Sequence, residues 1–389
     1  MRLYTDAIDN SAGVDTSDHE VNIKILLGIA VADGEMTEKQ RNTLLPQMTD
    51  EVAALVLRDN YFQSQALSIG QRLAQRQLEE QGRFMRFLEK KGQLDRAIEF
   101  LPDEDTLAER KARGLGLTSP EQAVLLAYSK MWLNDELIAS DLPEDPWVAT
   151  ALERYFPSRL REQFSAYIPR HPLKREIIAT HVLNSMVNRV GPTFVHRLGE
   201  VTGMTAPQIV RAYLATREVF GLVKTWQEIE ALDSLVPDAV QAEMVIELRG
   251  LIARATTWFL RSRRLYEPTE QQVKRFAPAV QALRARLELQ GGYSDRAARW
   301  IEAGVPQPLA LHVDAAGGLF NALDIAEIAD ATRRPLDETA EVHAGVGERL
   351  GLDRLRQQIE LLPAESYWHG LAKLALGDDL ADLQRSIAL

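Results

Sequence analysis

The sequence predicts an all-α protein, a multi-helix array of long amphipathic helices. Apolar residues recur every three or four positions, which places them on one side of a helix. The clearest such stripe consists of Val240, Met244, Leu248, Leu251, Ala255 and Trp258. Helix-start signals are frequent, and no series of alternating β-branched segments with hairpin turns occurs. These observations together favour helices over any sheet.

The expected helix starts combine a hydroxyl N-cap with acids or glutamine in the first turn. Such residues satisfy free backbone N–H groups and complement the helix dipole. The starts lie at Thr37-Glu38, Thr49-Asp50-Glu51, Ser119-Pro120-Glu121-Gln122 and Thr269-Glu270.

Proline marks the expected helix boundaries. It lacks the N–H donor and restricts the residue before it, so helices usually end there. The predicted breaks lie near Leu101-Pro102, Asp141 to Pro146, Ile168 to Pro172, Gly191-Pro192 and Glu267-Pro268.

Two composition changes suggest the domain organisation. Residues 290–293 and 304–308 are rich in glycine and proline, so we predict a helical domain over 21–290 and a C-terminal helical subdomain over 291–389. One continuous helical array is the alternative. Residues 1–20 are small, polar and acidic. We expect an irregular loop there, of the kind that follows a strand, before a helix that starts near Asp18.

Composition excludes several classes of function. The chain has 389 residues, a formal net charge of −11 and no cysteine. Thiol nucleophiles, disulfides and cysteine–metal centres are therefore excluded, and a general nucleic-acid binder is disfavoured. No apolar run reaches membrane-spanning length, and the start does not resemble a signal peptide. A cytoplasmic protein with no membrane partner is expected.

Common catalytic motifs fail on their context. Gly114-Leu115-Gly116 follows a charged helical segment rather than a strand, so it does not start a dinucleotide-binding turn. His19-Glu20 would open a zinc-protease helix, but Ile23 stands where the second ligand is needed. The remaining histidines have no metal-ligand spacing. We therefore predict no metal site and no catalytic residue within the chain.

The segment 194–213 allows a different function. Two short helices around Thr202-Gly203-Met204 resemble a helix-turn-helix, with Gln208 and Arg211 as possible base-reading residues. A partner- or nucleic-acid-binding regulator is therefore the alternative hypothesis. An ordinary helical hairpin is favoured because the net charge is negative, and burial of this hairpin decides between the two.

Several stretches resemble the large bacterial NAD-specific glutamate dehydrogenases. The resemblance covers nearly the whole chain and is carried by 10–24 (NSAGVDTSDHEVNIK), 57–68 (LRDNYFQSQALS), 83–85 (RFM) and 115–121 (LGLTSPE). It implies that the chain is the C-terminal part of a longer polypeptide. Residues 1–20 then form the C-terminal edge, or remnant, of a catalytic α/β domain that binds NAD.

The resemblance also implies roles for three residues. In smaller glutamate dehydrogenases the matching motif is Asn-Ala-Gly-Gly-Val-x-x-Ser. By that motif Asn10 and Gly13 would contact the NAD cofactor, and Ser17 would contact the distal carboxylate of glutamate. An N-terminal helix cap is the alternative role for Ser17.

The implied reaction of the full-length enzyme is oxidative deamination of L-glutamate to 2-oxoglutarate and ammonia, in amino-acid catabolism. The resemblance further implies a homo-oligomer. Because the dinucleotide fold and proton-transferring groups lie outside this sequence, we expect no NAD bound to the chain alone and no activity. Its helices would serve structure, oligomerisation or regulation.

Overall fold

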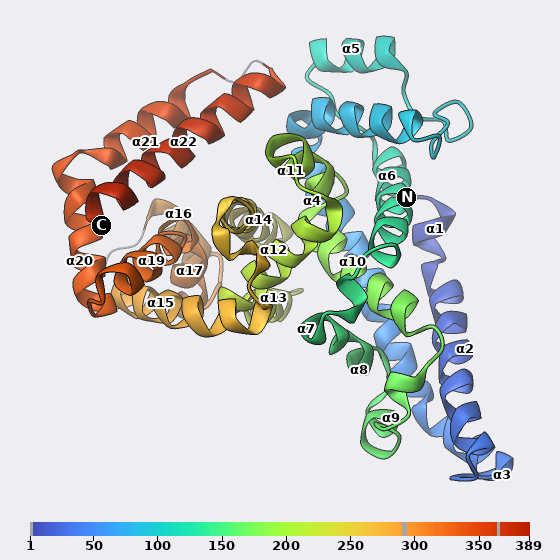
Figure 1. The fold of residues 1–389 in the computed structure, drawn as a ribbon. Helices are drawn as coiled ribbons and strands as arrows, with labels where there is room; N and C mark the ends of the chain where they lie inside the picture. Colours follow the sequence, from blue (N-terminus) through green and yellow to red (C-terminus); the bar gives the residue numbers. More distant parts are fainter. Residues whose placement is uncertain (1–2, 290–293, 364–365) are drawn as a thin grey trace. The chain divides into compact units, whose positions relative to one another are not determined.

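The computed structural model describes residues 3–289, 294–363 and 366–389, and every regular element within these ranges is a helix (Figure 1). The all-α prediction is confirmed. No helix of the described residues is long and apolar enough to cross a membrane. The chain forms two compact units, Met1–Gly199 with Thr205–Val210, and Glu200–Met204 with Arg211–Leu389.

The division into units falls within the hairpin of α11 (Phe194–Thr202) and α12 (Ala206–Val219). The boundary expected at residues 290 and 291 lies outside the described residues. The other expected boundary, at residue 20, falls in the middle of a continuous helix.

The first unit is built on one long helix, α4. Helices α2, α5, α6 and α10 all pack against α4, and α10 also packs against α6 and α8. The elements are α1 (Asp6–Asp9), α2 (Ser11–Ala32), α3 (Glu38–Leu44), η1 (Leu45–Met48), α4 (Thr49–Lys90), α5 (Glu104–Ala112), α6 (Ser119–Ile138), η2 (Leu142–Glu144), α7 (Pro146–Ala149), α8 (Ala151–Tyr155), α9 (Ser158–Gln163), η3 (Ile168–Arg170) and α10 (Lys174–Val190).

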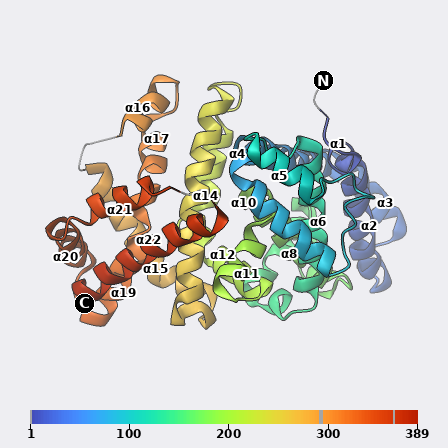
Figure 2. The same cartoon turned by 90° about the horizontal axis from the view of Figure 1, so that it is seen from above.

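The second unit centres on α14, whose predicted stripe is buried at Met244, Leu248, Leu251, Ala255 and Trp258. Helices α21 and α22 form a C-terminal hairpin (Figures 1 and 2). The elements are α13 (Leu222–Glu230), α14 (Asp238–Arg261), η4 (Arg263–Tyr266), α15 (Thr269–Leu289), α16 (Asp295–Glu302), α17 (Gln307–Asp314), α18 (Ala316–Leu319), α19 (Ala322–Thr332), α20 (Leu336–Arg349), α21 (Leu352–Leu361) and α22 (Tyr367–Ala388).

Helix starts follow the predicted chemistry with small shifts. Thr37 accepts from the Gln40 N–H and Gln40 reaches back to Thr37, a complete capping box. The cap predicted at Ser119 lies one residue earlier, at Thr118, whose N–H donates to Glu121 at 2.7 Å. The proline breaks are confirmed as helix ends or short 3₁₀ turns.

The prediction of an irregular segment over residues 1–20 was wrong. Helix α1 covers Asp6–Asp9, and α2 begins at Ser11 rather than near Asp18. Small polar residues have low helix propensity, which favoured a loop. Packing against α4 and α6 overrides that propensity.

Glycine permits close contact between α4 and the segment that leads into α6. A Cβ atom on Gly116 would lie 2.3 Å from the Ala74 carbonyl carbon, whereas a Cβ on Gly28 of α2 would meet nothing within 4 Å. The contact therefore requires glycine at position 116.

We predict that Gly116→Ala lowers the free energy of unfolding by about 1–3 kcal/mol, because the backbone of α4 must move. The matched change Gly28→Ala should raise it by about 0.5–1 kcal/mol, since alanine favours a helix interior. Urea unfolding measures both. Equal effects of the two substitutions would contradict the tight contact.

Candidate functional site

The three residues predicted to contact ligands lie on one side of the first long helix. Asn10 precedes α2, and Gly13 and Ser17 follow at a spacing that keeps all three on the same face. Two apolar residues, Val14 and Val21, continue this face and are 73% and 52% exposed. We call Asn10, Gly13, Val14, Ser17 and Val21 the α2 stripe.

The α2 stripe is an exposed surface of small, polar and apolar residues. Asn10, Gly13 and Ser17 are all exposed. A Cβ atom on Gly13 would lie 3.3 Å from the Asn10 side-chain oxygen. Glycine therefore leaves room for the asparagine amide over the first turn of α2.

Ser17 is not an N-cap, so that alternative role was wrong. Its hydroxyl lies inside α2 and donates to the Val14 carbonyl at 2.7 Å. To donate to a ligand instead, the side chain must rotate away from Val14. A hydrogen bond to a carboxylate is stronger than one to a carbonyl, so a bound anion can drive that exchange.

Helix α4 fixes the start of α2. The Asn60 amide donates to the Ile8 carbonyl and to the Ser11 hydroxyl, at 2.9 Å each, and Gln63 lies 3.5 Å from the same hydroxyl. These contacts satisfy backbone and side-chain groups at the junction of α1 and α2. They explain why a polar segment folds as helix here.

A polar network fixes the opposite face of α2. The Tyr155 hydroxyl donates to Asp18 at 2.7 Å and accepts from the Asn22 amide at 2.9 Å. The His19 ring stacks on the Tyr155 ring with centroids 4.4 Å apart. His171 Nδ1 accepts from the Leu173 N–H, so its Nε2 donates to the Asn22 carbonyl at 3.1 Å.

Three half-buried charges lie beside this network. Burial raises the pKa of Asp15 and of Asp59 to about 6, and each is raised further by a neighbouring carboxylate. Burial lowers the pKa of Lys130 to about 8, against the attraction of both carboxylates. The sequence predicted none of these residues as functional, although Asp15 and Asp59 both lie within stretches that carried the family resemblance.

The helix-turn-helix alternative is not supported by burial. Helix α12 is covered on most sides, with Ile209, Val210, Ala212 and Tyr213 buried. Gln208 is half-buried, and its side chain accepts from the Thr205 N–H as a cap. A recognition helix must present an open face to the groove.

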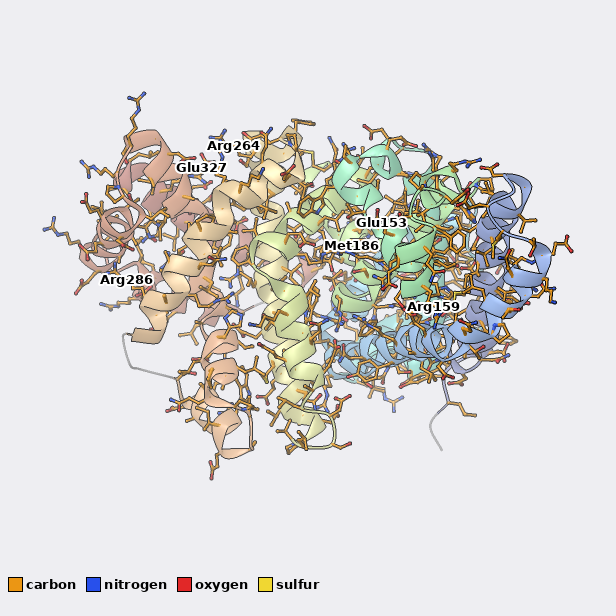
Figure 3. All side chains as sticks on the ribbon, turned by 90° about the horizontal axis from the view of Figure 1, so that it is seen from below. Glu153, Arg159, Met186, Arg264, Arg286 and Glu327 are labelled. Carbon is orange, nitrogen blue, oxygen red and sulfur yellow. The ribbon has the colours of Figure 1, made fainter. Side chains whose placement is uncertain are left out.

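Two arginines near the end of α14 are paired with acidic side chains. Arg264 contacts Glu327 at 2.9 Å, and the two lie together in Figure 3. Arg261 contacts Asp378 at 2.6 Å. Neighbouring acids therefore neutralise these two arginines. The described residues contain no group of three histidine, cysteine or acidic side chains that could hold a metal ion.

Comparison with known proteins agrees with the resemblance. A family described as "Glutamate dehydrogenase, C-terminal" matches residues 114–389, and one described as "Bacterial NAD-glutamate dehydrogenase, catalytic domain" matches residues 1–70. The α2 stripe and α4 up to Gly70 thus fall in the catalytic-domain match. Lys130 and Tyr155 fall in the C-terminal match.

Curated relatives extend over nearly the whole chain. NAD-specific glutamate dehydrogenases of Pseudomonas aeruginosa, Halomonas elongata and Mycobacterium tuberculosis are 46%, 44% and 38% identical over 99%, 98% and 99% of this chain. The chain spans 24% of the length of each relative. It belongs to the glutamate dehydrogenase C-terminal family, joined to a segment of the bacterial NAD-glutamate dehydrogenase catalytic domain.

Proposed function

We propose that this chain is the C-terminal helical part of an NAD-dependent glutamate dehydrogenase. The full-length enzyme oxidatively deaminates L-glutamate to 2-oxoglutarate and ammonia in amino-acid catabolism in the cytoplasm. The observation that carries the proposal is the α2 stripe, an exposed row of family-motif residues on a helix whose other face is fixed.

Ser17 would bind the distal carboxylate of glutamate. Its hydroxyl would break its hydrogen bond to the Val14 carbonyl and donate to the carboxylate instead. The exposed side chains of Val14 and Val21 would make apolar contacts with the methylene groups of the substrate. Asn10 and Gly13 would lie along the cofactor. The exposed Asn10 amide can hydrogen-bond to a flat ring, and the Gly13 backbone, which has no side chain, allows the ring to approach closely. When bound, NAD accepts the hydride from the substrate.

The remaining helices would brace the α2 stripe. Asn60 holds the start of α2 from α4, and Tyr155 holds its opposite face from α8. Catalytic geometry tolerates little misplacement, so support of this kind contributes to rate without touching the substrate. Contacts between copies of the enzyme in a homo-oligomer, and regulation, are further roles that we assign to the helical units.

The chain alone would not catalyse the reaction. Hydride transfer requires a dinucleotide-binding sheet and groups that move protons. Every regular element of the described residues is a helix, and these helices would form only one edge of the site. We therefore propose that it binds NAD only as part of the longer polypeptide.

We predict that the full-length polypeptide forms NADH from NAD when glutamate is added, and that the isolated 389-residue chain does not. The rate of NADH formation is measured by absorbance for both proteins at equal molar concentration. Glutamate-dependent NADH formation by the isolated chain would show that the proposed division of the site is wrong.

We predict that Ser17→Ala in the full-length enzyme raises the KM for glutamate about tenfold or more, because a hydrogen bond to a charged group contributes about 1.5–3 kcal/mol. Thr16→Ala is the matched control. Its hydroxyl is also exposed and bonded to an α2 carbonyl, that of Ala12, but lies off the α2 stripe. Steady-state kinetics test the pair, and a similar KM in both variants contradicts the carboxylate contact.

A further inference from the structure

Two sets of hydrogen bonds reach α2 at different ends of the α2 stripe. The first lies at the start of α2, where the Asn60 amide nitrogen donates to the Ile8 carbonyl and to the Ser11 hydroxyl, at 2.9 Å each. Ile8 lies two residues before Asn10, the residue proposed to contact the cofactor, and Ser11 directly follows it. We call these two hydrogen bonds the Asn60 clamp.

The second set lies beside Ser17, the residue proposed to contact the distal carboxylate of glutamate. The Tyr155 hydroxyl donates to Asp18 at 2.7 Å and accepts from the Asn22 amide at 2.9 Å. The Asn22 amide also donates to the second oxygen of Asp18, at 3.2 Å. The three side chains therefore form a closed ring of hydrogen bonds, which we call the Tyr155 clamp.

The start of α2 depends on the Asn60 clamp. The backbone at Asn10 is not helical, with φ −114° and ψ 22°, and its side chain makes no cap hydrogen bond to the described part of α2. Gly13 lies in the first turn, where backbone N–H groups lack intrahelical partners. A helix start of this kind opens locally unless tertiary contacts hold it. Loss of the clamp should therefore loosen the first turn of α2 and leave the later turns in place.

The Tyr155 clamp is anchored in the core of the first unit. Tyr155 is 8% exposed and Asn22 is 3% exposed. The Tyr155 ring packs edge-on against Phe156 with centroids 5.1 Å apart, and it stacks on His19. The clamp therefore fixes the turn of α2 that carries Ser17 against a rigid neighbour.

The two clamps are separate in space and in sequence. They share no residue, and Ser11 and Asp18 are about 10 Å apart along α2, because a helix rises about 1.5 Å per residue. Changes at that separation without common partners usually act independently. Asn60 falls in the catalytic-domain match and Tyr155 in the C-terminal match.

We propose that Asn60 and Tyr155 are positioning residues with separate tasks. The Asn60 clamp sets the affinity of the enzyme for NAD, and the Tyr155 clamp sets its affinity for glutamate. The inference rests on the proposed function, which places Asn10 and Gly13 at the cofactor and Ser17 at the substrate. It adds that the C-terminal family region determines affinity for the substrate through a residue that does not touch it.

The first test is Asn60→Leu in the full-length enzyme, which nearly keeps the side-chain volume and removes both donated hydrogen bonds. We expect the KM for NAD to rise about three- to tenfold, below the roughly hundredfold loss that an ångström of misplacement can cause, and the KM for glutamate to stay within about twofold. Gln71→Met is the matched control. Gln71 also lies on α4, and its amide donates to the Leu117 carbonyl at 3.1 Å rather than to α2. The control should keep both wild-type KM values.

The second test is Tyr155→Phe, which keeps the ring that stacks on His19 and removes the hydroxyl. The reverse pattern is expected, with the KM for glutamate raised about three- to tenfold and the KM for NAD within about twofold. Tyr128→Phe is the matched control, because the Tyr128 hydroxyl likewise donates to a carboxylate, that of Glu99, at 2.7 Å. Steady-state kinetics with each substrate varied at saturating levels of the other measure all four variants.

The double variant Asn60→Leu with Tyr155→Phe tests whether the clamps act separately. Each KM should rise by the factor seen in the corresponding single variant. A rise of both KM values together in either single variant overturns the inference, because it shows that α2 moves as one body and that the residue has a merely structural role. Unchanged KM values in both single variants overturn it as well.

Hydrogen exchange locates each effect without use of activity. Asn60→Leu should speed exchange in a peptide that covers residues 9–16 and leave one that covers residues 18–26 unchanged, and Tyr155→Phe should do the opposite. Faster exchange over the whole of α2 in either variant overturns the separation of the clamps. A wild-type enzyme that forms no NADH from glutamate contradicts the proposed function instead. The ligand assignments then fall with it, while exchange still decides whether the clamps act separately.

Discussion

The hydrogen bonds of the Tyr155 hydroxyl fix the helix on which the candidate site depends. The hydroxyl donates to Asp18 and accepts from Asn22, and the Tyr155 ring stacks on the His19 ring. A single residue of α8 therefore contacts one face of α2 over more than one turn. The other face of α2 is free to carry exposed valines and small polar groups. An exposed apolar row on a helix is unfavourable in isolation. It is tolerated here because the opposite face is held by buried contacts.

The first unit combines tight packing with poorly compensated charge. Gly116 lies against Ala74 with no space for a methyl group, and Arg110 contacts Glu121 through two short hydrogen bonds. Elsewhere on α2 and α4, burial raises the pKa of Asp15 and of Asp59, and several buried side-chain atoms lack a hydrogen-bond partner among the described residues. Proteins retain such local costs where function needs them, because the rest of the fold supplies the stability.

Most of the fold could be predicted from the sequence, and the reasons are local. The stripe of α14 and the Thr37 capping box depend only on residues within a few turns, so spacing and side-chain type suffice. The start of α2 could not be predicted, because Asn60 stabilises it from 49 residues away in the sequence. Asn10, Gly13 and Ser17 lie on one face only because Ser11–Ala32 forms a helix. The sequence favoured a loop over residues 1–20, so this common face could not be predicted. The contacts of Tyr155 with α2 depend on how two helices cross, which no local pattern encodes.

The arrangement also indicates why two family regions are covalently joined. The catalytic-domain match supplies α2 with its row of ligand-contacting candidates, and the C-terminal match supplies Tyr155 on the face behind it. Each region alone would leave polar groups of α2 without partners. Asn22 and Asp18 would lose the tyrosine hydroxyl. Because a buried polar group without a hydrogen-bond partner is costly, the two regions are expected to fold and to function as one structure.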